Sequence, residues 1–105
     1  MTVQECINKY KGKYTDISVY LGQSLEKHLC DIYHPLKGYG YCRAGQEDRL
    51  YSYLLDFDVK EFALYNRTSF NYLLENDNGF YNDKSKILCI LVSRTDVFND
   101  EKTGL

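Results

Sequence analysis

Several features that mark common classes of protein are missing from this chain. Among 105 residues there is no tryptophan, one proline and two alanines. No apolar stretch approaches the ~18 residues that a membrane span needs. The longest apolar run, residues 87–92, has the length of one buried strand. The first residues lack the basic start and apolar middle of a secretory signal. We therefore expect a cytoplasmic protein with no membrane contact.

A strong charge of either sign is also missing. The formal charge is −2, and the pI is near 5.6. A protein that binds duplex DNA by itself usually has a basic face and a high pI. A mimic of the phosphate backbone would need dense carboxylates on one face. The composition favours neither class, and direct binding of nucleic acid is the weaker expectation for this chain.

The usual motifs of metal and cofactor sites are absent. His28, Cys30, His34 and Cys42 fall within 15 residues, but zinc ligands normally come in tighter pairs such as C-x2-C. The sequence has no P-loop, no dinucleotide fingerprint and no serine elbow. We therefore expect no metal and no cofactor. Without an export signal, we expect the four cysteines, Cys89 among them, to be free and mostly buried.

Tyrosine is what the sequence has in excess. Eleven residues are tyrosine, in a chain whose hydrophobic content is 44%. Residue types with AT-rich codons (Asn, Ile, Lys, Tyr, Phe) number 37, against 14 for Gly, Ala, Pro and Arg. An AT-rich genome would raise the tyrosine total, although it would not decide where along the chain the tyrosines fall.

The hydrophobic pattern predicts an α+β fold in a single small domain over residues 1–105, with N-terminal helices followed by a small sheet and short helices. The pattern T-x-x-E at Thr2 predicts a helix over about 2–11. Asp16 is positioned to cap a second helix that ends before Pro35, and a strand over 17–21 with a helix from Ser24 is the alternative.

The second half predicts a mixture of strands and short helices. A strand is expected over Leu50–Phe57, and Asp58-x-x-Glu61 is expected to begin a helix. The clearest strand is 86–93, which is apolar and β-branched. Weaker signals predict a helix from Thr68 or Ser69 to Leu74, a turn at Asn76–Gly79, and a frayed tail over 99–105.

One motif has the form of an enzyme site. Asp56-Phe-Asp58-Val-Lys60 resembles the local pattern of PD-(D/E)xK nucleases, in which carboxylates hold Mg²⁺ and the lysine positions water or stabilises charge. This resemblance covers a few residues, and the proline that usually precedes the motif is missing. A metal-dependent nuclease is one alternative function. The other interpretation places these acids at a strand edge and as caps of the next helix.

A glycine-rich loop over 36–46 carries the second candidate site. It interleaves two tyrosines with two glycines and two cations, and tyrosines from the next segment could extend the same surface. Tyrosine and arginine are enriched where proteins bind one another. The mixture would also suit stacking on single-stranded nucleic acid, which is a second alternative. The residues expected to contact a partner are Lys37, Tyr39, Tyr41, Arg43, Tyr51, Tyr53, Asp56, Asp58 and Glu61.

These observations favour a small interaction protein without catalytic activity. Its size and codon bias fit an accessory protein of a phage or other mobile element. Such proteins include anti-CRISPR and other anti-defence inhibitors, an analogy of size and composition alone. The expected partner is a protein, such as a host enzyme that processes nucleic acid, whose basic groove would accept the acidic residues. A tyrosine-rich surface would also permit a homodimer.

Overall fold

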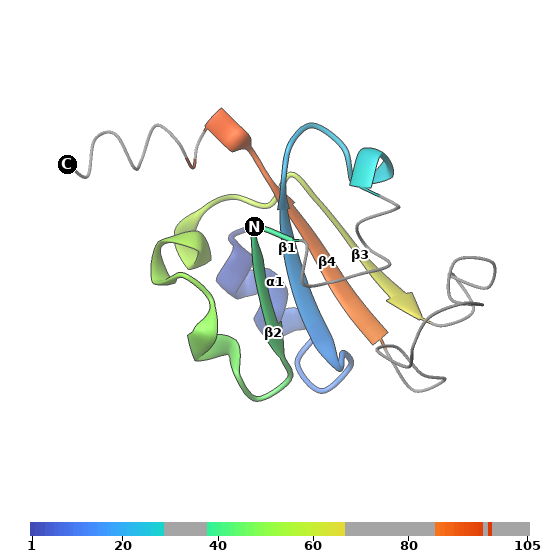
Figure 1. The fold of residues 1–105 in the computed structure, drawn as a ribbon. Coiled ribbons are helices and arrows are strands. Elements are labelled where there is room, and N and C mark those ends of the chain that lie inside the picture. Colours follow the sequence, from blue (N-terminus) through green and yellow to red (C-terminus); the bar gives the residue numbers. More distant parts are fainter. Residues whose placement is uncertain (29–37, 67–85, 96, 98–105) are drawn as a thin grey trace.

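The computed structural model describes residues 1–28, 38–66, 86–95 and 97. These residues form the helix α1, a four-stranded mixed sheet, short 3-10 turns and a helical turn at Arg94, Thr95 and Val97 (Figure 1). The strand order is β2-β1-β4-β3, with β1 and β4 parallel and both outer pairs antiparallel. The elements are α1 (Val3–Lys9), β1 (Asp16–Leu21), η1 (Leu25–His28), β2 (Gly40–Arg43), η3 (Glu47–Arg49), η4 (Ser52–Asp56), β3 (Glu61–Asn66) and β4 (Lys86–Val92).

The sequence predicted the first helix and the last strand correctly. Thr2 and Glu5 form the expected capping box at the start of α1, because each side chain accepts a hydrogen bond from the other residue's backbone N–H (3.2 and 2.8 Å). β4 lies between β1 and β3, and its apolar side chains are buried on both faces. A parallel neighbour and burial on both faces explain why this strand is uniformly apolar.

The second N-terminal helix was predicted wrongly, and the alternative strand is correct. Asp16 begins β1 instead of capping a helix. In β1, Ile17 and Val19 face the core beneath α1, while Tyr20 belongs to a second cluster on the other face. The apolar spacing of three to four residues arose because both faces of β1 are buried. The fold is therefore mixed α/β with a dominant sheet and, in the described residues, little α-helix beyond α1.

Two further elements differ from their predictions. The segment predicted as a strand over Leu50–Phe57 forms 3-10 turns that include η4. Its buried members, Leu50 and Leu54, would share one face of a strand, but Ser52 between them on that face is exposed, and the backbone turns as a 3-10 helix. The helix predicted after Asp58 is the strand β3, whose six residues pair with β4. Pairing with a buried strand outweighs the local capping signal.

The two faces of the sheet differ in composition. On the face that α1 and η4 cover, the main core is built from aliphatic side chains with Cys6, Tyr14 and Cys42. The opposite face carries a smaller cluster that includes Tyr20, Leu25 and Cys89, with the buried Ser18 and Asp16 nearby on β1. The buried polar side chains of β1, Asp16 and Ser18, thus lie on the face opposite the main core.

Some predictions lie outside the described residues. These are the helix from Thr68 or Ser69 to Leu74, the turn at Asn76–Gly79 and the tail over 99–105. Over the ranges that are described, no helix has the length and apolar character required to cross a membrane.

Candidate functional site

The outer edge of β2 carries a cluster of four aromatic rings, here called the aromatic patch: Tyr39, Tyr51, Tyr53 and Phe57. The Tyr51 ring is stacked on Tyr53 with centroids 5.5 Å apart and planes 16° apart. The Tyr39 ring lies 5.5 Å from Tyr51 at 44°. Phe57 meets Tyr53 edge-on at 6.1 Å. These distances are typical of aromatic pairs in contact, so the four rings form one continuous group.

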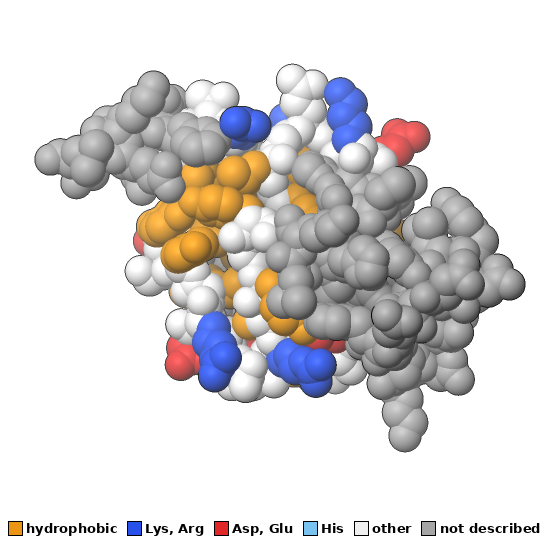
Figure 2. Space-filling model, viewed as in Figure 1, with side chains coloured by type: hydrophobic (Ala, Val, Ile, Leu, Met, Phe, Trp, Pro, Cys, Tyr) orange, Lys and Arg blue, Asp and Glu red, His pale blue; other side chains and the backbone are white. Residues whose placement is uncertain are grey.

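Tyr51 is the most exposed member of the aromatic patch. Its side chain is 53% exposed, whereas those of Tyr39, Tyr53 and Phe57 are half-buried. The hydroxyls of Tyr39 and Tyr53 are hydrogen-bonded to each other. Tyr51 therefore covers a pair of rings that is already joined, and it exposes part of its own ring to solvent. Figure 2 shows an apolar area where η4 meets the start of β2.

The main core holds the aromatic patch from below. Leu54, in the middle of η4, is fully buried in the main core, and Leu50 before η4 is also buried there. Both leucines pack against β2 at Gly40, where an added Cβ would lie 3.3 Å from each of them. A Cβ at Gly38 would lie 2.4 Å from Ser18 Oγ. The glycines of this loop therefore allow the chain to pack against itself.

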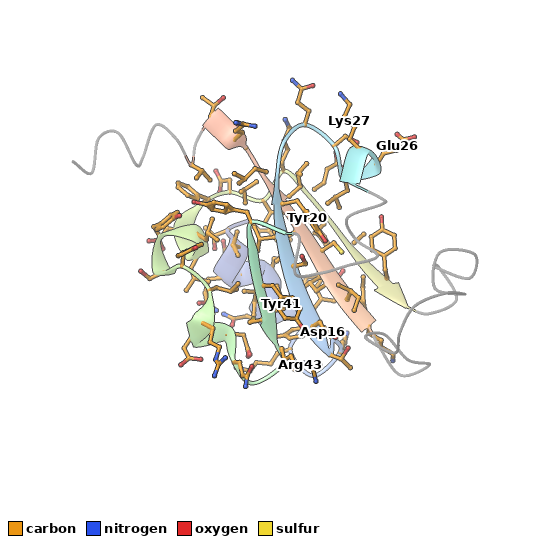
Figure 3. All side chains as sticks on the ribbon, viewed as in Figure 1. Asp16, Tyr20, Glu26, Lys27, Tyr41 and Arg43 are labelled. Carbon is orange, nitrogen blue, oxygen red and sulfur yellow. The ribbon has the colours of Figure 1, made fainter. Side chains whose placement is uncertain are left out.

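Tyr41 is placed differently from Tyr39, although only two residues separate them. It lies within β2, where Gly40 and Cys42 face the main core and Tyr41 faces the other side of the sheet (Figure 3). Its hydroxyl donates a hydrogen bond to Asp16 Oδ1 on β1 at 2.7 Å. Thr15 donates to the other oxygen of that carboxylate at 2.7 Å. Tyr41 therefore belongs to a polar network that ties β2 to β1.

The titration behaviour of Tyr41 reflects this network. Burial, followed by the hydrogen bond to the Asp16 carboxylate, raises the pKa of Tyr41 from its ordinary value of 10 to about 12. Arg43, on the same face of β2, acts in the opposite direction on that pKa. A hydroxyl held in this state is a hydrogen-bond donor at neutral pH and not a nucleophile.

The structure divides the cationic aromatic loop that the sequence suggested. Tyr39 joins Tyr51 and Tyr53 as one surface, which agrees with the expectation that these tyrosines adjoin. Tyr41 and Arg43 lie on the other face of the sheet, and Lys37 lies outside the described residues. In the part of the chain that the structure describes, the cations and tyrosines of this loop therefore do not form one surface.

The three acidic residues of the expected site occupy separate positions. Asp56 is the last residue of η4 and is exposed. Asp58 forms an isolated bridge with Thr2, beside a hydrogen bond from Val59 N–H to the Met1 carbonyl. Glu61 begins β3, and its carboxylate accepts a hydrogen bond from the Leu25 N–H at 3.3 Å. Of the three, only Asp56 belongs to the helix that carries the aromatic patch.

The strand required by the nuclease hypothesis is not present at this motif. Asp56 ends a 3-10 turn, Asp58 lies in an isolated bridge, and Lys60 precedes β3. Within the described ranges, no three residues of His, Cys, Asp or Glu are grouped as metal ligands would be. The motif therefore lacks the strand placement on which its resemblance to a nuclease depended.

The three cysteines that the structure describes give no sign of a reactive thiol. Cys6, Cys42 and Cys89 are free and buried, as predicted, while Cys30 and His34 lie outside the described residues. Burial raises the pKa of all three thiols, that of Cys42 to about 12 with Glu47 as a second cause. A protonated thiol is a poor nucleophile and a poor metal ligand. Cys42 also faces the main core, whereas η1, which ends at His28, packs on the opposite side.

Sequence reasoning missed two participants in these sites. Phe57 belongs to the aromatic patch, but it follows the end of η4, and its edge-on contact with Tyr53 has no spacing signal in a 3-10 helix. Asp16 was assigned to a helix cap, although it accepts the Tyr41 hydrogen bond. The chain matches no known family model, no curated protein and no solved structure.

Proposed function

We propose that this chain is a non-enzymatic interaction protein that binds a protein partner through the aromatic patch. The observation that carries the proposal is the placement of Tyr51, which is stacked on Tyr53 and yet 53% exposed. Tyrosine at the centre of an apolar surface is typical of binding hot spots, because its large ring loses little conformational entropy when it is covered. The exposed part of this ring is therefore available to a partner.

The charge of the segment that carries Tyr51, Tyr53 and Phe57 supports a basic partner. Residues 47–61 carry five carboxylates and two basic side chains, a formal charge of −3, against −2 for the whole chain. Asp56 and Asp58 within this segment are exposed. An apolar patch carried on an acidic segment complements an apolar and basic surface on another protein.

Within this proposal, the partner is an enzyme that processes nucleic acid, and the chain inhibits it by occupying its basic groove. This more specific role, together with a mobile-element origin and a cytoplasmic location, is supported by size, composition and the acidic segment. An inhibitor of this kind needs no catalytic residue of its own, only a surface that competes with nucleic acid.

The experiment is a comparative capture followed by a binary titration. Wild type, Tyr51→Ala and Lys27→Ala are immobilised, and extract of the native cell is passed over each. Lys27 is exposed on η1, on the other side of the sheet, and serves as the control. We expect a protein that wild type and Lys27→Ala retain and Tyr51→Ala does not, and it should then bind wild type when purified. Equal retention by Tyr51→Ala would refute the proposal.

A further inference from the structure

We infer that the aromatic patch recognises an arginine side chain of the partner, with the guanidinium stacked on the outer face of Tyr51 and paired with the carboxylate of Asp56. The inference rests on the proposed function and specifies the chemistry of the partner. It follows from the spacing of the rings, the geometry of η4 and the charge of the segment.

The spacing of the rings makes the aromatic patch a platform and not a cage. Tyr51 lies 5.5 Å from both Tyr39 and Tyr53, so these rings are in contact and leave no room between them for a cation. A bound group must therefore lie on the outside of the Tyr51 ring. A flat guanidinium stacks on one ring face, whereas a compact ammonium is a strongly hydrated point charge that gains less from a single flat surface.

The geometry of η4 places a carboxylate beside the platform. In a 3-10 helix the side chains at i and i+3 are eclipsed, about 6 Å apart along the axis. Tyr53 and Asp56 have this spacing within η4, so Asp56 lies on the same side of the helix as the ring on which Tyr51 is stacked. Asp56 is exposed and can meet a guanidinium edge without being buried unpaired.

The charge of the segment favours an arginine over the other groups that could bind an aromatic surface. A second copy of the chain would bring two segments of formal charge −3 together. A single-stranded nucleic acid would stack its bases on Tyr51 but would bring phosphates toward the same carboxylates. An arginine offers both a stacking plane and a positive charge, so it is the occupant that the site complements on both counts.

The test uses two synthetic probes, a short glycine-spaced arginine peptide and the same peptide with lysine at every arginine position. Binding to the full chain and to each variant is followed by NMR through the backbone amide signals of residues 51–57, which every variant retains. We expect the arginine peptide to bind about two- to five-fold more tightly than the lysine peptide, as expected for a cation–π contact at an exposed ring. Tyr51→Phe should keep this preference, Tyr51→Leu should remove it, and Asp56→Asn should weaken both peptides.

Glu26→Gln is the matched control, because Glu26 is an exposed acid on η1 at the opposite face. Equal affinities for the two peptides, or a preference that survives in Tyr51→Leu, would overturn the inference. So would Tyr51-dependent binding of an oligothymidylate, or a dimer of wild type that Tyr51→Leu dissociates in sedimentation. If a captured partner depends on Tyr51 while the peptides bind equally, the proposed function stands and the arginine inference fails. If capture does not depend on Tyr51, the proposed function itself fails.

Discussion

Tyr39 and Tyr41 come from one short loop, and the structure gives them opposite surroundings. The Tyr39 ring joins Tyr51 and Tyr53 in a surface whose outermost ring is half in water. The Tyr41 hydroxyl is bonded to Asp16, a carboxylate that is 7% exposed. The comparison shows that tyrosine serves two purposes here. In the aromatic patch the rings provide contact area, while in the Tyr41 network the hydroxyl provides a bond between strands.

The difference has a physical origin in the path of the chain. Tyr41 lies inside β2, where strand alternation directs it away from the main core and toward β1. Tyr39 precedes the strand, so alternation does not constrain it, and its ring packs toward η4. We therefore expect substitutions in the two regions to separate stability from binding.

The largest effect on stability should come from the support beneath the aromatic patch. Leu54 is fully buried and packs against Gly40. Leu54→Ala should lower the free energy of unfolding by about 2–5 kcal/mol, because it removes buried methyl groups and leaves a cavity. Chemical denaturation measures this loss. A loss below about 1 kcal/mol would mean that η4, and the rings it carries, are not anchored in the core.

Tyr41→Phe should lower stability by less and leave binding intact. It deletes the hydrogen bond to the Asp16 carboxylate while keeping the ring. A hydrogen bond to a charged group typically contributes about 1.5–3 kcal/mol, and we expect a destabilisation in that range. Denaturation gives the stability, and the same variant should bind the captured partner as wild type does. Loss of binding in a folded Tyr41→Phe protein would erase the distinction between the two regions.

The pH dependence of stability also tests the role of the Tyr41 hydroxyl. The pKa of Tyr41 is raised in the folded protein to about 12 from 10. Its contribution is complete below pH 10 and is lost as pH rises toward 12, because only the unfolded state releases the proton in that window. Tyr14, with a pKa also raised to about 12, acts in the same direction. Between pH 10 and 12, stability should therefore fall less steeply in Tyr41→Phe than in wild type. Identical slopes would contradict the assignment.

The smallest expected effect concerns Glu61. This residue was expected to meet a partner, but its carboxylate accepts the Leu25 N–H at 3.3 Å. Because Glu61 is exposed, Glu61→Gln should change the free energy of unfolding by less than about 1 kcal/mol. It should not change partner affinity, whereas Asp56→Asn should weaken it. If Glu61→Gln weakened the partner's affinity more than Asp56→Asn does, the binding surface would lie nearer η1 than the aromatic patch.

The elements that the sequence predicted well are those in which local and tertiary preferences agree. The capping box at Thr2 and the apolar run of β4 need no information from the rest of the chain. β1 was ambiguous because burial on both faces of a strand imitates helical spacing. β3 was misassigned because Asp58 has the local form of a helix cap, while pairing with β4 decides the outcome.

The candidate site was predictable only in part, because its assembly also depends on tertiary contacts. That Tyr51 and Tyr53 join Tyr39 depends on η4 folding back over β2, a long-range event that leaves no local pattern. Gly40 lets Leu50 and Leu54 of the same chain approach the backbone of β2, a contact that the loop sequence alone does not indicate. The residue types predicted an aromatic surface. Which tyrosines belong to that surface depended on tertiary packing.

The most direct test of the central claim is the affinity of the captured partner for Tyr51→Ala, measured beside the thermal stability of that variant. The hot-spot account predicts at least about a ten-fold weaker complex. It also predicts that the free energy of unfolding falls by about 0.5–1.5 kcal/mol for each of the two surface ring contacts that are lost, with Tyr39 and with Tyr53. Tyr41→Phe should lower stability and keep full affinity. Full affinity in Tyr51→Ala would contradict the claim that the aromatic patch is the binding surface.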